Sequence, residues 1–361
     1  MKKILFITAH RRDRAPNQRF RFEQYFDFLN QHGFECTLSP LIKTAEEDRL
    51  FYAKGNYLKK IQLGLLFASR RLKDIFRANQ FDIIFIAREA FITGSTFFEK
   101  QLSNSKAKII FDFDDAIWMN VISANNKLFA WLKDGTKTNR IISYADLVFA
   151  GNEYLSVHAN KFNNHVVIIP TTIDTEIYQP NYNVNKNKIV IGWSGSVSTI
   201  EHFQFAIPAL KILKKKYANK IEIKVIGDGN YRNEDLDIIG LPWKMETEIR
   251  DLQSIDIGIM PLPNDEWTWG KCGLKGLQYM ALEIPTLMSP VGVNKIIISD
   301  GVNGYLANNT DEWVDKISRL IKDVELRVSI GKSGRKTVVE QYSVEKQKSN
   351  YLNCFNSLCN Y

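Results

Sequence analysis

Short runs of consecutive apolar residues alternate with longer stretches of helical periodicity along the whole chain. In the first half the runs lie near Ile4–Ile7, Ile83–Ile86, Ile109–Phe113, Leu147–Ala150 and Val166–Ile169, and in the second half near Ile189–Trp193, Ile221–Ile226, Ile255–Met260 and Pro285–Met288. Strands that are apolar on both faces are typical of parallel sheets covered by helices on both sides. The pattern therefore predicts two doubly wound, Rossmann-like α/β domains, in which ligands bind beyond the carboxyl ends of the strands.

A segment rich in Asn and Tyr, Asp174–Lys188, separates the two series of strands and carries Pro180. It is the best linker candidate, because such residues interrupt regular structure. We expect an N-terminal domain over residues 1–182, a C-terminal domain over 183–342 and a cleft between them. Residues 343–361 have a helical pattern, with Ser343 as the expected N-cap.

Composition is that of a soluble globular protein, with 45% hydrophobic and 24% charged residues among 361. No apolar run approaches the roughly 20 residues needed to span a bilayer. The start, MKKILFITAH, has a short apolar run and no cleavage site, so it predicts a first strand rather than a signal peptide. The four cysteines show no metal-binding spacing, which favours a reducing, cytoplasmic setting.

The net charge of +8 is concentrated in residues 1–182. Such an excess indicates an anionic partner, either a membrane surface or a phosphate-bearing substrate. No recognition motif organises the charge for nucleic acid, which we exclude as a partner. The strongest basic cluster lies in an apolar-striped helix expected over residues 57–78. It is compatible with an interfacial membrane helix or with a domain helix whose lysines lie in water.

Candidate chemistry in the second half lies in loops that follow strands. The loop before the helix expected from Leu274, together with the first turn of that helix, carries Lys271, Gly273 and Lys275. Unpaired backbone N–H groups and the helix dipole suit a phosphate there, and the lysines strengthen that interpretation. The alternative is an ordinary loop with solvated lysines. The small residues Ser194–Ser196 would let a ligand approach backbone amides closely.

Two loops of the first half also carry candidate chemistry. The first strand is followed by an arginine-rich segment, Arg11–Arg21. Guanidinium groups suit phosphate and carboxylate, although a solvated basic loop is the alternative. The strand near Phe113 is followed by an acidic cluster of Asp112, Asp114 and Asp115. These carboxylates would bind a metal, act as a base or accept hydrogen bonds from sugar hydroxyls, or one of them would merely cap the next helix.

The segment IIFDFDDAIW resembles the opening motif of haloacid-dehalogenase phosphatases, in which the first aspartate is the nucleophile. The segment GDGN faintly resembles a later metal-binding loop of that family. However, Ala116 stands where that family has threonine, and the motif follows two strand–helix units instead of lying on the leading strand. This phosphatase resemblance is the weaker of two.

The second resemblance covers nearly the whole chain. The segment DIGIMPLPNDEWTWGKCGLKGLQYMALEIPTLMSPVGVNKIIISDGVNGYLA resembles the C-terminal signature of family 4 of the retaining glycosyltransferases, also called glycosyl transferases group 1. IPTTIDTEIYQP, IVIGWSGSVST, KVIGDG and RFRFEQYFDFLNQHGFE extend it. The resemblance implies a GT-B fold of two Rossmann-like domains facing a cleft, with the donor bound by the C-terminal domain and the acceptor mainly by the N-terminal one. The last helix would pack back on the N-terminal domain.

The implied function is transfer of a hexose, with retention of configuration, from a nucleotide-diphosphate sugar to a glycan or lipid-linked acceptor. The expected setting is cell-envelope polysaccharide or lipopolysaccharide synthesis, in the cytoplasm or peripherally at the inner face of an anionic cytoplasmic membrane. The expected donor-binding residues are Ser194, Gly195, Ser196, Gly227, Trp243, Gly273, Leu274 and Gln278. The expected catalytic residues are Lys271, Lys275, Asp114 and Asp115, and the expected acceptor-binding residues are Arg19, Arg21 and Arg88. No metal or other cofactor is expected.

The chain departs from the family pattern at two positions. The family has two glutamates eight residues apart, one for the donor sugar and one for the ribose, where this chain has Gly270 and Gln278. Gln278 retains hydrogen-bonding capacity, whereas Gly270 has no side chain. The family's Arg/Lys pair is absent from GWSGSVSTIEHF, and we expect Lys271 and Lys275 to supply its charge. A GT-B-like epimerase, or a protein that binds a nucleotide-sugar or glycan without turnover, is the alternative function.

Overall fold

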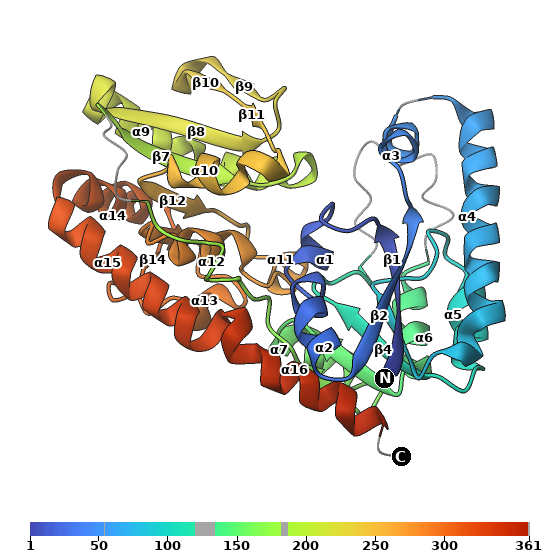
Figure 1. Cartoon of the computed structure of the whole chain (residues 1–361). Coiled ribbons are helices and arrows are strands. Elements are labelled where there is room, and N and C mark those ends of the chain that lie inside the picture. The colour runs from blue at the N-terminus through green and yellow to red at the C-terminus, as the bar shows by residue number, and fades with distance from the viewer. Residues whose placement is uncertain (54, 120–133, 182–186, 360–361) are drawn as a thin grey trace. The chain divides into compact units, whose positions relative to one another are not determined.

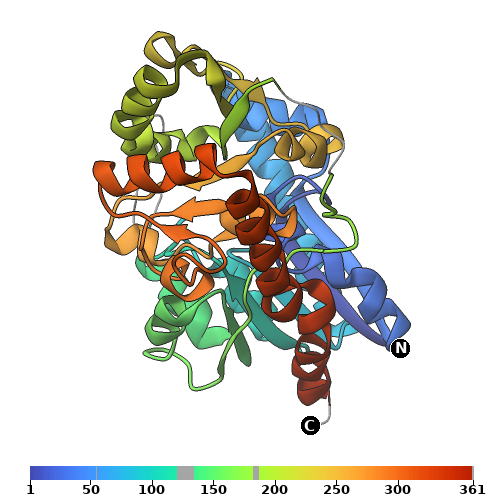
Figure 2. The same cartoon turned by 90° about the vertical axis from the view of Figure 1, so that its left-hand side faces the viewer.

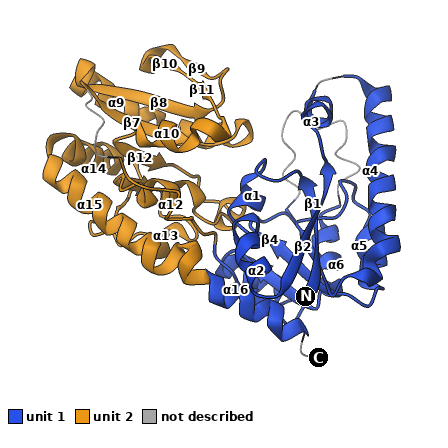
Figure 3. Ribbon diagram, viewed as in Figure 1, with its two compact units in different colours: residues 1–170, 348–361 blue, residues 171–347 orange. Residues whose placement is uncertain are grey.

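A computed structural model of the chain describes residues 1–53, 55–119, 134–181 and 187–359. The chain forms two compact units, which Figure 3 shows in different colours. Unit 1 contains residues 1–170 and 348–361, and unit 2 contains residues 171–347. None of the described helices is both long enough and apolar enough to cross a membrane.

In the described part of unit 1, six parallel strands form one sheet in the order β2-β1-β3-β4-β5-β6. The strands are β1 (Lys2–His10), β2 (Phe34–Ile42), β3 (Ile83–Ala87), β4 (Lys108–Phe113), β5 (Leu147–Ala150) and β6 (Val166–Ile168). The helices between them are α1 (Pro16–Arg19), α2 (Phe26–Gln31), α3 (Ala45–Tyr52), α4 (Tyr57–Arg77), α5 (Phe97–Ser103), α6 (Thr136–Tyr144) and α7 (Glu153–Ala159) (Figure 1). The central strands are buried on both faces, as their continuous apolar runs predict.

The described part of unit 2 has a second parallel sheet of six strands, in the order β11-β8-β7-β12-β13-β14, and a two-stranded antiparallel ribbon. The strands are β7 (Ile189–Ser194), β8 (Ile221–Gly227), β9 (Arg232–Asn233), β10 (Ile238–Ile239), β11 (Leu241–Pro242), β12 (Ile257–Met260), β13 (Thr286–Met288) and β14 (Tyr305–Leu306). The helices are α8 (Ile200–Phe203), α9 (Ile207–Tyr217), α10 (Glu248–Gln253), α11 (Glu266–Trp269), α12 (Leu274–Ala281), α13 (Asn294–Ile297), α14 (Thr310–Lys322) and α15 (Val324–Thr337). The two sheets confirm the predicted pair of doubly wound domains.

The segment after β6 belongs to unit 2, although the sequence suggested a first domain up to residue 182. The backbone N–H of Ile173 donates to the carbonyl of Tyr342 at 2.9 Å, and the Arg335 guanidinium donates to the carbonyl of Tyr178 at 2.7 Å. These hydrogen bonds attach the segment to unit 2 before the linker predicted at Asp174–Lys188, of which residues 182–186 lie outside the described residues.

The last helix is α16 (Val344–Cys359), drawn in red beside the C label in Figures 1 and 2. The hydroxyl of Ser343 accepts a hydrogen bond from the backbone of Lys346 at 3.1 Å, which is the capping contact expected at its start. From residue 348 the helix belongs to unit 1. There Tyr351 stacks on Tyr25 with 4.3 Å between ring centroids.

Candidate functional site

In unit 2 the ends of β7 and β8 approach each other closely at two glycines. The N–H of Gly195 donates to the carbonyl of Ile226 at 2.9 Å, and Gly227 has φ of +132°. A Cβ on Gly227 would lie 1.6 Å from the Gly195 carbonyl oxygen, and one on Gly195 would lie 2.3 Å from the ring of buried Trp193 and 2.8 Å from Cε of Lys275. Only glycines therefore fit here, and they bring the backbone after β7 beside the lysine.

The two predicted lysines lie at the start of α12. The Lys275 ammonium is 5.2 Å from the ring centre of buried Trp193, and that of Lys271 is 4.8 Å from the ring of Trp267. Gly273 precedes the helix with φ of +72°. Two cations and the first turn of an α-helix thus occur within five residues, an arrangement that favours binding of a phosphate group.

Histidine 202, on α8, belongs to the same region and was not predicted from the sequence. Burial, with smaller contributions from the charges of Lys275 and Lys271, lowers the pKa of His202 to about 4. The imidazole is therefore neutral near pH 7. Its Nδ1 is buried without a hydrogen-bond partner among the described residues. The only available sequence signal was its place in the helix that follows the β7 loop.

Trp243 and Gln278 meet at a buried carboxylate, Glu248, which was not predicted from the sequence either. The indole N–H of Trp243 donates to Oε1 of Glu248 at 2.9 Å, and the Tyr178 hydroxyl donates to Oε2 at 2.9 Å. The Gln278 amide donates to the Tyr178 hydroxyl at 3.0 Å and to Glu248 at 3.4 Å. A glutamate at position 278 would bring a second carboxylate to this buried cluster, so the amide is the chemically compatible group.

The remaining predicted donor residues occupy the same part of unit 2. Ser194 ends β7, where its backbone N–H and hydroxyl lie 2.6 and 2.9 Å from the Tyr279 hydroxyl. Ser196 begins the next turn and caps it together with Thr199. Leu274 is the half-buried first residue of α12. Gly270 is buried at the end of α11 and has no side chain to offer a ligand.

In unit 1 the predicted acceptor residue Arg21 is only 2% exposed. Its guanidinium forms a two-point ion pair with Asp112 at the end of β4 and donates to the carbonyl of Ile169. These contacts connect the arginine-rich segment to β4 and give Arg21 a structural position. Asp112 is the residue that the phosphatase resemblance implies as the nucleophile, and here its carboxylate is bound by Arg21. Arg19 ends α1, half-buried, with its guanidinium 4.9 Å from the Phe20 ring.

Arg88 brings the other two aspartates together. It follows β3 with φ of +63°, and its guanidinium donates to Asp114 at 2.6 and 2.8 Å and to Asp115 at 3.1 Å. Burial would lower the pKa of Arg88, but the two carboxylates outweigh it and raise the pKa. A left-handed arginine is strained, and such strain concentrates at functional sites. The cluster combines one cation with two carboxylates at the carboxyl ends of adjacent strands.

A second cluster in unit 1 surrounds His10, the last residue of β1, which was not predicted from the sequence. Its Nδ1 is 3.9 Å from Asp48, and Arg14 donates to the same carboxylate at 2.6 Å. The Tyr52 hydroxyl lies 3.2 Å from Nε2 of His10. Burial lowers the pKa of His10 to about 4 in spite of Asp48, and the positive charges of Arg14, Arg11 and Arg88 contribute. The imidazole is neutral near pH 7.

The described residues contain no group of three or more His, Cys, Asp or Glu side chains placed to hold a metal ion. The acidic cluster at Asp112, Asp114 and Asp115 is instead paired with Arg21 and Arg88. The expectation that no metal is needed stays a prediction.

Comparison with known proteins identifies the domain and the fold. Residues 188–323 match the family model of glycosyl transferases group 1. A search of curated proteins found no match. Among solved structures, sucrose-phosphate synthase from Thermosynechococcus elongatus is 12% identical with a TM-score of 0.70, and each chain is covered completely. A glycosyltransferase from Rickettsia africae is 14% identical, with a TM-score of 0.68 and coverage of 99% of this chain and 98% of that one.

The HepE protein of Anabaena, solved in complex with UDP-glucose, is also 14% identical, with a TM-score of 0.67 and coverage of 99% of this chain and 100% of that one. At these identities the structural likeness concerns the fold, which is the predicted GT-B fold. The chain thus carries a glycosyl transferases group 1 domain in unit 2, within a GT-B architecture.

Proposed function

We propose that the protein is a retaining glycosyltransferase that moves a hexose from a nucleotide-diphosphate sugar to a glycan or lipid-linked acceptor. The main support is the cluster of Lys271, Lys275 and the glycine loops in the group 1 domain, which suits a diphosphate. The HepE structure, similar in fold, contains UDP-glucose. The proposed setting is cell-envelope polysaccharide synthesis, in the cytoplasm and peripherally at the inner membrane face.

In the proposed reaction the bond between the anomeric carbon and the diphosphate oxygen breaks, and the acceptor oxygen bonds to that carbon on the same face. The acceptor's proton goes to the departing phosphate. Negative charge therefore grows on the diphosphate, and Lys271, Lys275 and the N–H groups at the start of α12 stabilise it. Fixed charges and dipoles of this kind often supply the largest single contribution to catalysis. No protein nucleophile and no metal take part in this scheme.

The nucleoside would bind at the Glu248 cluster. Trp243 is half-buried, so part of its ring is available for stacking on a base, while its N–H is held by Glu248. Gln278 and Glu248 together offer an amide and a carboxylate for ribose hydroxyls. In this proposal Glu248 supplies the carboxylate that Gln278 itself lacks.

The acceptor would bind at the carboxyl edge of the unit 1 sheet. Asp114 and Asp115 would accept hydrogen bonds from sugar hydroxyls, and Arg88 and Arg19 would face an anionic group. Neutral His10 offers a further hydrogen-bonding partner at the same edge, since its pKa is about 4. We assign Arg21 a structural role here, because its ion pair with Asp112 is buried.

The direct test is incubation of the purified chain with nucleotide-diphosphate sugars and a glycan or lipid-extract acceptor, followed by NMR of the anomeric proton of the product. The proposal predicts a product with the donor's anomeric configuration, and a loss of turnover in Lys271→Ala. Lys332→Ala, an exposed lysine on α15, serves as the matched control and keeps full turnover. An inverted product excludes the retaining mechanism. Donor binding without product for any acceptor favours the binding protein, and isomerised donor favours the epimerase.

A further inference from the structure

Helix α4 exposes a long row of large apolar side chains on the surface of unit 1. These residues, called here the apolar face of α4, are Tyr57, Leu58, Ile61, Leu65, Leu66, Leu72 and Phe76. Leu58, Leu65 and Phe76 are 79%, 68% and 85% exposed. Spacings of three, four and seven residues place most of them on one side of the helix. Large apolar residues that gather on one side of a helix, instead of being scattered singly, indicate an interaction site.

The opposite side of α4 is already packed into unit 1. Leu63 and Phe67 form a core cluster with Leu41 and Ile42 of β2 and with Phe91. The helix therefore has two apolar faces, and only one of them is needed for folding. The exposed face is in excess of what the fold of unit 1 requires.

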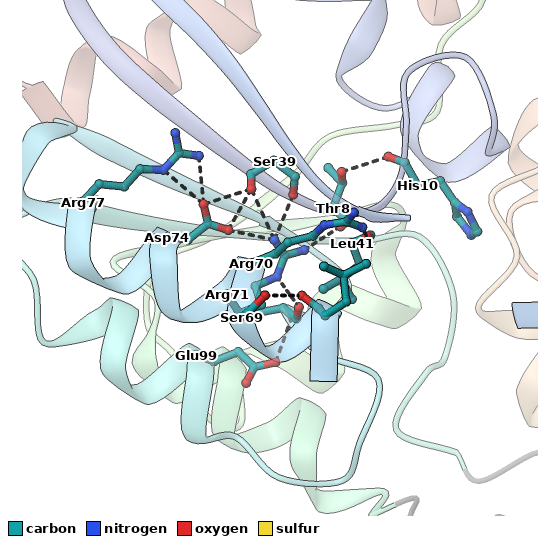
Figure 4. A network of polar contacts seen from close by, with 12 residues as sticks. Thr8, His10, Ser39, Leu41, Ser69, Arg70, Arg71, Asp74, Arg77 and Glu99 are labelled. Carbon is teal, nitrogen blue, oxygen red and sulfur yellow. Dashed lines mark hydrogen bonds and ion pairs between the residues drawn. The ribbon is translucent and has the colours of Figure 1, made fainter. Parts of the chain in front are cut away.

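A buried ion pair fixes the rotation of α4 about its axis (Figure 4). Arg71 is fully buried and donates to the carbonyls of Thr8 at 2.7 Å, Ser39 at 3.0 Å and Ala90 at 2.6 Å. Its guanidinium also lies 2.8 Å from Asp74, one turn further along the helix. Turning the exposed face inward would break these contacts in the interior of unit 1, so that face stays on the surface.

The charge beside the apolar face is positive. The one acidic residue of α4, Asp74, is buried and neutralised by Arg71 and Arg77. Lys59 and Lys73 are exposed and have no ion-pair or hydrogen-bond partner in the part of the chain that the structure describes. An anionic surface complements this arrangement, whereas the same helix of a second copy would present charges of the same sign.

We propose that α4 lies flat on an anionic lipid bilayer, with its apolar face among the headgroups and Lys59 and Lys73 against lipid phosphates. Its polar inner positions exclude a spanning role, in agreement with the absence of a helix suited to crossing among the described residues. An amphipathic helix with lysines at its border is the usual form of such a contact. This inference rests on the peripheral location proposed above. It specifies the helix, the residues and the lipid charge that would form the contact.

The test is flotation of the full chain with vesicles of phosphatidylcholine alone or of phosphatidylcholine mixed with phosphatidylglycerol. We expect binding to the mixed vesicles that weakens with added salt, and weak binding to phosphatidylcholine alone. Lys59→Gln and Lys73→Gln should each lower the partition coefficient about fivefold, the effect of one basic residue near an anionic surface. The triple variant Leu58→Gln, Leu65→Gln, Phe76→Gln should lower it at least about tenfold through lost apolar burial.

The matched control carries Ile239→Gln, Ile296→Gln and Val302→Gln, which change apolar residues of unit 2 that are 75%, 68% and 60% exposed, and it should leave partition unchanged. Nucleoside diphosphate binding, measured in parallel, separates loss of membrane contact from failure of the proposed function. Equal binding of the parent chain and the triple variant to mixed vesicles would overturn the proposal. So would a dimer in analytical ultracentrifugation that the triple variant abolishes, since a second copy would then cover α4.

Discussion

Glu248 explains why an amide stands at position 278. Its carboxylate already accepts hydrogen bonds from Tyr178 and Trp243 within a buried cluster, and the Gln278 amide supplies a further donor. A carboxylate at 278 would repel Glu248 where little solvent screens it. The amide at position 278 therefore has a local structural reason, and the carboxylate of this cluster belongs to Glu248.

We expect Gln278→Glu to lower the free energy of unfolding by about 1–3 kcal/mol, the cost of an uncompensated buried polar group. Because two adjacent carboxylates raise each other's pKa, the loss should grow as pH rises and shrink in acid. Urea unfolding of Gln278→Glu and of the exchange variant Gln278→Glu/Glu248→Gln tests this. The exchange should restore most of the stability, and equal losses in both variants would contradict the argument.

A pH dependence of folding is expected from three histidines, of which His10 and His158 are half-buried and His202 is buried. Burial lowers the pKa of His10, His158 and His202 from 6.5 to about 4. Between those values the unfolded chain binds protons that the folded chain does not, so stability is fully present above pH 6.5 and falls as pH is lowered toward 4. Urea unfolding across this range should show the slope. His202→Gln should reduce it, and an unchanged slope would argue against a buried neutral His202.

At the scale of elements, α4 depends on one buried guanidinium. Arg71 joins it to β1 through Thr8 and to β2 through Ser39. We expect Arg71→Met to cost about 3–5 kcal/mol, because Asp74 then stays buried with only partial neutralisation by Arg77. The double variant Arg71→Met/Asp74→Leu removes both charges and should recover much of this loss. Thermal unfolding measures the stability of both variants. If Arg71→Met is as stable as the parent chain, Arg71 does not hold α4 in place.

Some strands of the two sheets could be predicted from the sequence, and others could not. The strands β1, β4, β7 and β12 were predicted because each is buried on both faces and therefore continuously apolar. The two-residue strands β11 and β14 were not, since they are too short to carry a pattern and exist through pairing with neighbours. Helix α4 packs one apolar face on unit 1, as expected of a domain helix, and exposes the other, so its contact with a membrane stays a prediction.

At the scale of the whole molecule, the fold and the lysine cluster were predictable, whereas pairings between distant residues were not. Lys271 and Lys275 are close in sequence and lie on either side of the start of a recognisable helix. Glu248 meets Gln278 across 30 residues, and Arg21 meets Asp112 across 91. Such contacts arise only when the sheet brings loop and strand ends together, so no local pattern contains them. His10 and His202 could not be predicted either, because neither belongs to a sequence motif.

We propose that unit 2 binds a nucleoside diphosphate at Lys271 and Lys275. Calorimetric titration of the full chain with UDP, GDP and ADP in turn, repeated on Lys271→Ala/Lys275→Ala and on Lys332→Ala, tests this binding. We predict binding of one nucleotide that Lys332→Ala retains and that the double variant loses by about 100-fold or more, since hydrogen bonds to charged groups contribute about 1.5–3 kcal/mol each. No binding by any nucleotide, or equal binding by the double variant, would contradict the claim.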